Sequence, residues 1–375
     1  MEAYAVQRRR PTEVRAEVEQ LWRRNLPLEQ SASAKFSWLY ERAPLPPESI
    51  FVLGVVPAPA AVGEPDFIPV GTAGVGLREL AVAGRVLRAG LLADLAVDRA
   101  HRTVAPALRL VREVKAWVLD ELDLAYGFPN QHARGVFRRA GYQPLGPIQR
   151  YVRVLRHRGY LERMQPADFT RLPERLRAPA QAALARGPGA RWLAAATLDG
   201  LQLARDLPDV VSGYLALDVS SASRPPHDVD ALWGRCGDAY AVAAVRSTRL
   251  LSWRYPEAPE RRWFAARRGA ALAAYAVVDQ VDDAAHIRDL FGERAAVVTL
   301  LHRLIFDAYR RGAASVSMRY LGDAWLHQAL RAARFEARDA DRVVFWGASS
   351  RLAAAQREAL ADPSRWFLTD LDEDV

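Results

Sequence analysis

The sequence has almost no cysteine and almost no lysine. Cys236 is the single cysteine, which excludes an internal disulfide and a metal site built from several cysteines. Lysine occurs only at Lys35 and Lys115, so nearly all of the 52 basic residues are arginines. No apolar stretch approaches the roughly 18 residues that a membrane span needs, and the first residues do not resemble a secretory signal. These absences predict a cytoplasmic protein with no membrane span and no metal.

The positive charge of the chain does not form a pattern typical of nucleic-acid binding. The net charge is +8, and the pI is about 9.8. The arginines are scattered along the chain with acidic residues between them, whereas a nucleic-acid surface gathers its basic residues on one face. We therefore expect no nucleic-acid partner. The length of 375 residues, half of them hydrophobic, is enough for two well-packed cores.

Four short segments recur in the same order in the second half of the chain, which predicts two copies of one module. The separation between matching segments shrinks by 20 residues between the second and third pairs. We place this loss in the second copy, opposite the loop from Pro57 to Pro65. The four pairs are Val18–Arg24 with Val229–Arg235, Ser37–Tyr40 with Ser252–Tyr255, Ala93–Leu95 with Arg288–Leu290, and Val136–Tyr142 with Ala329–Phe335.

Apolar periodicity and turn residues predict alternating strands and helices in the first copy. Strands are expected at 50–56, 70–77, 91–97, 124–128 and 148–155, and helices at 12–24, 106–120 and 132–140. We expect a first domain at 1–156, a proline-containing helical connector at 157–208 and a degenerate second domain at 209–348. Residues 349–375 are expected to form a C-terminal helix and a solvent-exposed acidic tail.

One segment of the first copy carries a recognisable motif. A buried strand from Leu91 leads into Arg102-Thr103-Val104-Ala105-Pro106-Ala107 at the start of a helix. This segment resembles the acyl-CoA signature R-x-x-G-x-G/A of the GNAT superfamily of N-acetyltransferases. Backbone N–H groups at such a helix N-terminus bind the pyrophosphate of CoA. Ala105 replaces the central glycine, and we expect strain if it adopts a positive φ; Pro106 removes one donor.

The resemblance implies both a fold and an activity. The fold is α/β (α+β), with two tandem GNAT-like modules that each hold a mixed, mostly antiparallel, twisted sheet flanked by helices. The activity is that of an N-acetyltransferase, which carries an acyl group from acetyl-CoA, as co-substrate, to a small-molecule amine. The tandem arrangement is similar to that of proteins linked to bacterial polysaccharide or sugar N-acetylation, and to tandem thiol-precursor and aminoglycoside acetyltransferases.

The resemblance also implies which residues form the site. Asp94, on the motif strand, is a candidate base for the amine, or a structural partner of a nearby arginine. Phe137 stands where many members carry a tyrosine acid, so either Tyr126 or Tyr142 takes that role or no protein acid is used. Asn130 is expected to bond the CoA arm or to cap a helix. The residues expected to contact acyl-CoA are Leu95, Ala96, Val97, Arg102, Thr103, Val104, Ala105, Ala107, Asn130 and Phe137.

The second copy has the sequence patterns of the same strands and helices but lacks the acyl-CoA motif. Glu293 follows its matching strand, where a carboxylate would repel phosphates. We interpret this copy as a half that shapes the acceptor cleft, with Trp38, Tyr40, Trp253 and Tyr255 either in that cleft or in the core. Two alternatives stay open: a Fem-type transferase with the same doubled fold that uses aminoacyl-tRNA, and a non-catalytic pseudo-acetyltransferase.

Overall fold

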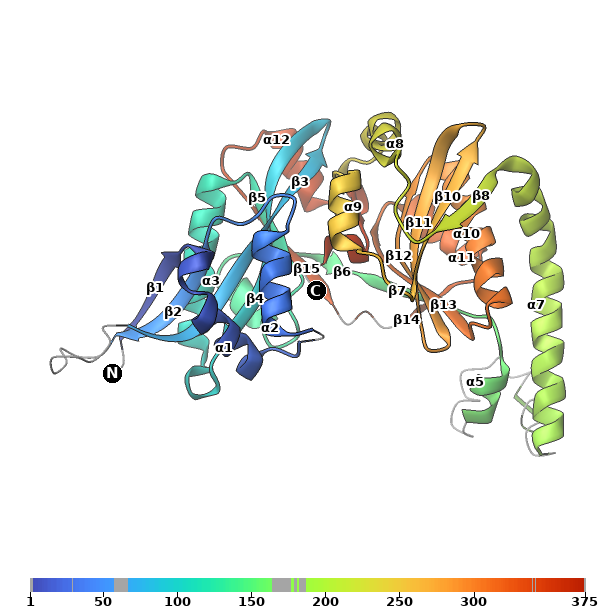
Figure 1. Ribbon diagram of the computed structural model, residues 1–375, viewed down its shortest axis with the longest axis horizontal. Coiled ribbons are helices and arrows are strands. Elements are labelled where there is room, and N and C mark those ends of the chain that lie inside the picture. The colour runs from blue at the N-terminus through green and yellow to red at the C-terminus, as the bar shows by residue number, and fades with distance from the viewer. Residues whose placement is uncertain are drawn as a thin grey trace.

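The computed structural model of the chain describes residues 3–28, 30–56, 67–163, 177–178, 181, 187–338, 340 and 342–373. The loop from Pro57 to Pro65 lies outside these ranges, so the expected site of the length difference is not described. Two sheets lie side by side, and the long helix α7 (Pro188–Ala216) flanks the second sheet on its outer side (Figure 1).

The first half of the chain forms an antiparallel ladder that ends in one parallel pair. Strands β1 to β4 pair antiparallel in chain order, and β5 then pairs parallel to β4. One apolar cluster lies under α3 and another under α1 and α2. The elements are β1 (Ala3–Arg9), α1 (Arg15–Asn25), α2 (Ala32–Phe36), η2 (Ser37–Glu41), β2 (Ile50–Val56), β3 (Ile68–Val82), β4 (Arg85–Val97), η3 (Arg99–His101), α3 (Val104–Glu121), β5 (Leu124–Gly127), α4 (Arg134–Arg139) and β6 (Gln143–Pro147).

The second half repeats this order. Strands β10 to β12 pair antiparallel, and β13 pairs parallel to β12, with the apolar residues of α10 in the largest core cluster. The elements are β8 (Asp218–Ala222), α8 (Val229–Cys236), β9 (Val242–Ala244), α9 (Thr248–Arg254), β10 (Arg261–Arg268), β11 (Ala271–Val281), β12 (Ala284–Gly292), α10 (Arg294–Arg310), β13 (Ser315–Gly322), α11 (Ala324–Ala332), β14 (Glu336–Arg338), β15 (Val343–Ala348), α12 (Ala354–Ala361), β16 (Trp366–Leu368) and η7 (Asp370–Asp372). The expected fold class is confirmed.

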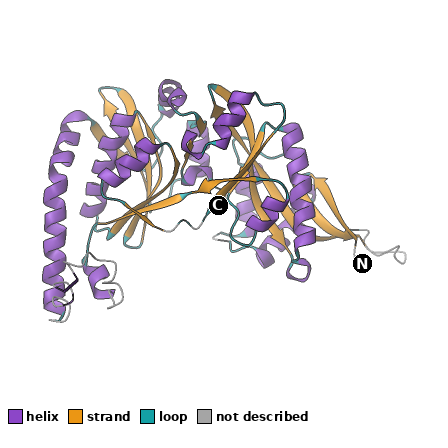
Figure 2. Ribbon diagram, turned by 180° about the vertical axis from the view of Figure 1, so that it is seen from behind, coloured by secondary structure: helices purple, strands orange, loops and turns teal. Residues whose placement is uncertain are grey.

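The two halves exchange their last strands. Strand β7 (Gln149–Val154) leaves the first half and pairs with β13 and β14 of the second. In return, β15 inserts between β5 and β6 of the first half. Strands β9 and β16 bridge β3 to β13, so the sheets are continuous through the middle of the molecule (Figure 2). Neither half can separate without breaking these strand pairings. The division at residues 156 and 209 stays a prediction from the sequence.

Equivalent residues of the two copies meet between the halves. Trp38 and Trp253 stack with ring centroids 4.3 Å apart and planes inclined by 6°. Each indole N–H donates to the backbone carbonyl of the other residue, at 3.1 and 2.8 Å. These residues belong to a repeated segment found in the sequence, and the reciprocal contact places them at a local pseudo-twofold axis.

The acidic C-terminal segment is buried, and our expectation of a solvated tail is wrong for its described residues. After α12, β16 pairs with β13 and β9, and Asp370, Asp372 and Glu373 are then 8%, 1% and 2% exposed. Basic partners make this burial possible. The Arg246 guanidinium, itself 0% exposed, lies 3.6 Å from Asp372, and the Arg254 guanidinium donates to carbonyls of the segment.

In its described residues, the expected connector contains all of one helix and only part of a second. Helix α5 (Arg158–Arg163) follows β7, and α7 runs beyond residue 208 to Ala216, with Pro208 inside it. Helix α7 packs against α5 and α10, and His157 contacts Asp199 at 2.7 Å. Within the described residues, no helix is long and apolar enough to cross a membrane.

Candidate functional site

A cleft of about 1310 Å³ runs between the two halves. One wall comes from the ends of β4 and β5 and from helices α2, α3 and α4 of the first half. The opposite wall comes from β10 to β13, the end of α9 and the C-terminal segment, and it carries mainly arginines and carboxylates. Because its two walls come from different halves, the cleft exists only in the assembled chain.

Asp94 lies at a β-bulge in strand β4. The register between β3 and β4 pairs Thr72 with Ala96 and Gly74 with Ala93, so Asp94 and Leu95 together oppose Ala73. Asp94 has φ +55°, a conformation that Asp tolerates better than most residues. A bulge turns a side chain out of the regular alternation of a strand, and here it directs Asp94 into the cleft.

Asp94 pairs with a lysine rather than with an arginine. The Lys35 ammonium lies 2.9 Å from Asp94 Oδ1, and the two side chains are 11% and 3% exposed. The Thr72 hydroxyl donates to the Asp94 carbonyl at 3.4 Å and accepts from the Trp22 indole N–H at 3.1 Å, which anchors the bulge from behind. Asp94 Oδ2 is buried without a hydrogen-bond partner among the described residues. One carboxylate oxygen is therefore held, and the other has an unused acceptor site.

The Tyr40 hydroxyl lies close to this second oxygen. A Cβ atom built on Gly74 would be 2.7 Å from Tyr40 Oη and 3.6 Å from Asp94 Oδ2, so both polar atoms border the space that the glycine leaves empty. Burial, reinforced by the Asp94 charge, holds the pKa of Tyr40 well above its ordinary value. Tyr40 therefore remains a neutral hydrogen-bond donor. It is carried by the π-helix η2, a type of turn that is rare and frequent at functional sites.

A groove opens where β4 and β5 separate. Their parallel pairing ends at Leu92 opposite Gly127, where a Cβ on Gly127 would lie 3.0 Å from Leu92 Cβ. Beyond that point the cleft has a predominantly apolar lining that includes Phe137, which is 5% exposed. The further lining residues of this part are Leu95, Val111, Val114, Phe128, Asn130 and Ala133.

Asn130 closes the turn that precedes α4. Its Oδ1 accepts from the backbone N–H groups of His132 and Ala133 at 3.0 and 3.1 Å. These bonds lie in the turn rather than in the helix, whose N-cap residue is Ala133, and the side chain also borders the groove.

The turn after β4 leads directly into helix α3. Thr103 is its N-cap residue, and no side chain caps the helix within the described chain. Ala105 lies in the first helical turn and is not among the residues with positive φ, so the strain that we considered for Ala105 does not arise. Thr103, Val104 and Ala105 are exposed and Ala107 is half-buried. The first N–H groups of a helix have no intrahelical acceptor, so Val104 and Ala105 present donors at this end.

Arg102 closes the turn by binding its own strand. Its guanidinium donates to the Val97 carbonyl at 3.2 and 3.1 Å and to Asn25 Oδ1 at 3.1 Å. The N–H of Asp98 donates to Val70 on β3, and successive residues of an antiparallel strand point their N–H groups to opposite sides. The Val97 N–H therefore points to the open side of β4, whereas that of Ala96 points to β3. Of these two N–H groups, that of Val97 is therefore the one directed away from β3.

The two candidate tyrosine acids lie in the core. Tyr126 is 0% exposed and packs against Phe128 and Trp366. Tyr142 is 1% exposed, with the Lys115 ammonium 5.2 Å from its ring centroid, and burial raises its pKa far above the ordinary value. Neither belongs to the described lining of the cleft. The structure brings Asp94, Leu95, Asn130 and Phe137 together along the cleft and leaves these two tyrosines outside it.

The matching position of the second half is closed. Asp289, the counterpart of Asp94, is 0% exposed and is bound by Arg246 at 3.2 Å, by the Tyr275 hydroxyl at 2.6 Å and by the Thr369 hydroxyl at 2.8 Å. Its third partner belongs to the C-terminal segment, which fills the space beside β12 and β13. The residue equivalent to Lys35 is Leu250. This half therefore has the matching carboxylate without an open site around it.

Sequence reasoning missed Lys35 as the partner of Asp94 and missed the arginines of the opposite wall. A signal for Lys35 was present, since it is one of two lysines in a chain that otherwise uses arginine. Of the four aromatic candidates, Tyr255 lines the cleft, Tyr40 lies beside Asp94, and Trp38 and Trp253 form the stacked pair. No sequence signal marked the arginine wall, because its residues come from several separate elements.

Comparison with known proteins identifies the fold. The sequence matches no protein-family model and no curated protein. The structure is similar to a conserved protein of unknown function from Enterococcus faecalis V583, described as a probable N-acyltransferase, and to a GCN5-related N-acetyltransferase from Anabaena variabilis. In both comparisons the TM-score is 0.59, the identity 10%, and the match covers 92% of this chain and 72% of the other.

A third similar structure is a GCN5-related N-acetyltransferase from Kribbella flavida, with a TM-score of 0.55 and 13% identity over 98% of this chain and 81% of the other. These matches extend over almost the whole chain, including both halves. They show that the chain has the fold of GCN5-related N-acetyltransferases.

Proposed function

We propose that this chain is an acyl-CoA-dependent N-acyltransferase whose reaction takes place at Asp94. The observation that carries the proposal is the contrast between the halves: the first has an open groove between β4 and β5 that leads to a bulge carboxylate. In the second, the matching carboxylate of Asp289 is sealed by that half's own C-terminal segment. The solved structures of the same fold that are described as N-acetyltransferases or a probable N-acyltransferase support this assignment.

The groove suits the arm of an acyl-CoA. Apolar side chains of α3 and α4 border it, and the uncapped start of α3 presents N–H donors, which favour phosphate. In this proposal the thioester carbonyl accepts a hydrogen bond from the Val97 N–H, which stabilises the negative charge that develops on its oxygen. Arg102 supports this site indirectly, because it holds the Val97 carbonyl and thereby the end of the strand.

Asp94 would accept the proton that the amine loses. The amine nitrogen forms a bond to the acyl carbon, the carbon–sulfur bond breaks, and the thiolate of CoA takes a proton from solvent. Lys35 holds Asp94 Oδ1, so Oδ2, which has no partner among the described residues, is the oxygen that would accept the proton, directly or through a water molecule that the neutral Tyr40 hydroxyl orients. We propose acetyl as the acyl group and a small amine, such as an amino sugar, as the acceptor, in a cytoplasmic protein.

Thermal-shift titration with CoA tests the binding step. We expect CoA to raise the melting temperature of the wild-type chain, because a ligand that binds only the folded state stabilises it. Ala133→Trp, which fills the groove, and Arg102→Glu, which removes the hydrogen bonds to the Val97 carbonyl, should abolish the shift. Arg99→Glu, in the same turn, is the matched control, since Arg99 is exposed. Absence of binding at millimolar CoA would contradict the proposal and favour an aminoacyl-tRNA-dependent or non-catalytic role.

Turnover of Asp94→Asn tests the chemical step. With acetyl-CoA and a panel of primary amines that includes glucosamine, thiol release should fall by roughly 10²–10⁴-fold. The CoA-dependent thermal shift should persist in this variant. Unchanged turnover would remove Asp94 from the mechanism.

A further inference from the structure

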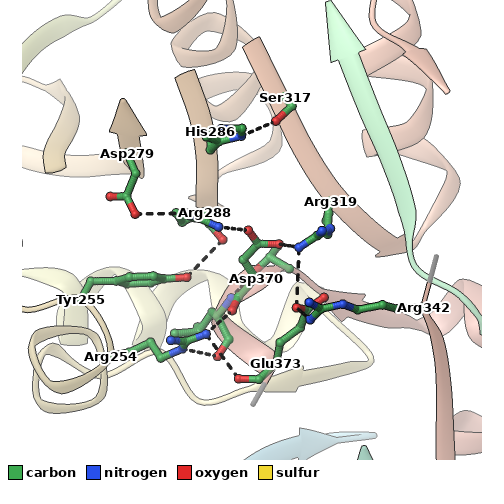
Figure 3. A network of polar contacts seen from close by, with 12 residues as sticks. Arg254, Tyr255, Asp279, His286, Arg288, Ser317, Arg319, Arg342, Asp370 and Glu373 are labelled. Carbon is green, nitrogen blue, oxygen red and sulfur yellow. Dashed lines mark hydrogen bonds and ion pairs between the residues drawn. The ribbon is translucent and has the colours of Figure 1, made fainter. Parts of the chain in front are cut away.

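The wall of the cleft opposite Asp94 carries more positive than negative charge. Its described lining residues include five arginines and three carboxylates, which come from separate elements of the second half. These are Arg254, Arg261, Arg288, Arg319 and Arg342 together with Asp279, Asp370 and Glu373. Figure 3 labels all of these except Arg261 and shows them linked by hydrogen bonds and ion pairs.

The carboxylates lie beneath the guanidinium groups. The side chains of Asp279, Asp370 and Glu373 are 6%, 11% and 2% exposed. Those of the arginines Arg288 and Arg342 are 31% and 36% exposed. The charges that reach the cleft are therefore mainly guanidinium groups, and the carboxylates hold them in place from behind.

Strand register explains why these arginines share a face. Arg319 on β13 lies two residues after Ser317, and His286 on β12 bonds Ser317 at 2.7 Å, so alternation places these side chains on one side of the sheet. A bulge in β12 between the pairs at Ile287 and Asp289 leaves Arg288 without an opposite residue on β11. Its guanidinium reaches Asp279 at 3.1 Å and Asp370 at 2.9 Å.

The buried C-terminal segment completes this arrangement. Arg342 binds Glu373, and the Arg319 guanidinium lies 3.8 Å from Glu373 and 3.9 Å from Asp370. Arginine presents five N–H donors in a planar fork, so contacts with one or two carboxylate oxygens do not use all the donors of a guanidinium. The segment that closes the second half's own site thus orients the arginines toward the first half's site.

We propose that Arg288, Arg319 and Arg342 bind an anionic group, a carboxylate or a phosphate, of the acceptor whose amine reacts at Asp94. The inference rests on the proposed function for the reaction, but the anion site itself does not require catalysis. The amine of such an acceptor would face Asp94 on one wall of the cleft, and its anionic group would face the arginines on the other wall. The phosphates of CoA are the other possible source of the same chemistry.

Binding of inorganic phosphate to the full chain tests the site directly. At constant ionic strength, phosphate should raise the melting temperature in a saturable way, whereas chloride should not. The double variant Arg319→Gln/Arg342→Gln should reduce phosphate affinity by about tenfold or more, because charge-assisted bidentate contacts are lost. Arg85→Gln, an exposed arginine of the β3–β4 hairpin, should bind as the wild type does. No saturable shift in the wild-type chain would overturn the proposal.

Saturating CoA separates the two possible sources of the anion. Phosphate binding that persists with CoA present supports a site for the acceptor, and displacement by CoA would overturn that assignment. Glucosamine 6-phosphate should compete with phosphate and glucosamine should not; equal competition would also overturn it. If the double variant does not fold, Arg342→Lys provides the second test, with charge retained and weaker binding expected because the fork is lost. If CoA does not bind but phosphate still does, the result would count against the proposed function and not against the anion site.

Discussion

The ion pair between Lys35 and Asp94 should contribute strongly to stability, and a double-mutant cycle can measure its coupling. Both side chains are nearly buried, so removing one partner leaves an uncompensated charge, which in buried pairs costs about 3–5 kcal/mol. The cleft lets water reach the pair, so we expect about 3 kcal/mol for Asp94→Asn and for Lys35→Met. The double variant leaves no unpaired charge and should lose less than the sum, with a coupling of about 1–2 kcal/mol.

Urea unfolding followed by tryptophan fluorescence measures the four free energies of the cycle. Asn suits the backbone at this position, whereas Asp94→Ala should cost about 1 kcal/mol more because alanine is strained at φ +55°. The exposed pair Arg158–Glu162 is the control cycle and should show a coupling of about 0.5 kcal/mol or less. If the Lys35 and Asp94 effects add within about 0.5 kcal/mol, the pair is not coupled and the reasoning is refuted.

Three further predictions concern other parts of the molecule. Trp38→Ala should destabilise the chain by about 3 kcal/mol in urea, because it removes the stack with Trp253 and the hydrogen bond that the Trp38 indole N–H donates; a loss below 1 kcal/mol would contradict this. Burial lowers the pKa of His302, so the unfolded state binds more protons and stability should fall as the pH drops below about 6.5; the decline in unfolding free energy from pH 7 to 5.5 should be smaller in His302→Gln. Ala105→Gly should cost up to about 1 kcal/mol and leave CoA affinity unchanged, because Ala105 is helical; tighter CoA binding by calorimetry would refute it.

The closed second site suggests how, in a duplicated module, one half can lose its own open site and support the site of the other half. Asp289 keeps its place on the matching strand, next to a bulge at Arg288, but Arg246, Tyr275 and Thr369 bind its oxygens. The same C-terminal segment binds Arg319 and Arg342 at the cleft. One segment thus closes the second half and shapes the wall that faces the first.

Local patterns in the sequence were enough to predict most elements of the first copy and the position of Asp94. The strand expected at 50–56 matches β2, and the helix expected at 106–120 lies within α3. The partner of Asp94 was not predicted, because Lys35 is distant in sequence and a pairing of side chains leaves no periodic signal. The positions of the two candidate tyrosine acids were not predicted for a related reason. Tyr126 pairs with Leu91 across β4 and β5, and both side chains belong to the core cluster opposite the groove, a register that the sequence does not encode locally.

The sequence by itself determined the repeat, the alternation of strands and helices, and the strand–turn–helix segment that carries the resemblance. These follow from hydrophobic periodicity and turn chemistry, which act over a few neighbouring residues. Only the tertiary structure decided that β7 and β15 exchange sheets and that the acidic segment is buried. The same level of structure brings the arginine wall to face Asp94. Each of these depends on pairing between distant segments, where the free energy comes from contacts that no single stretch of sequence contains.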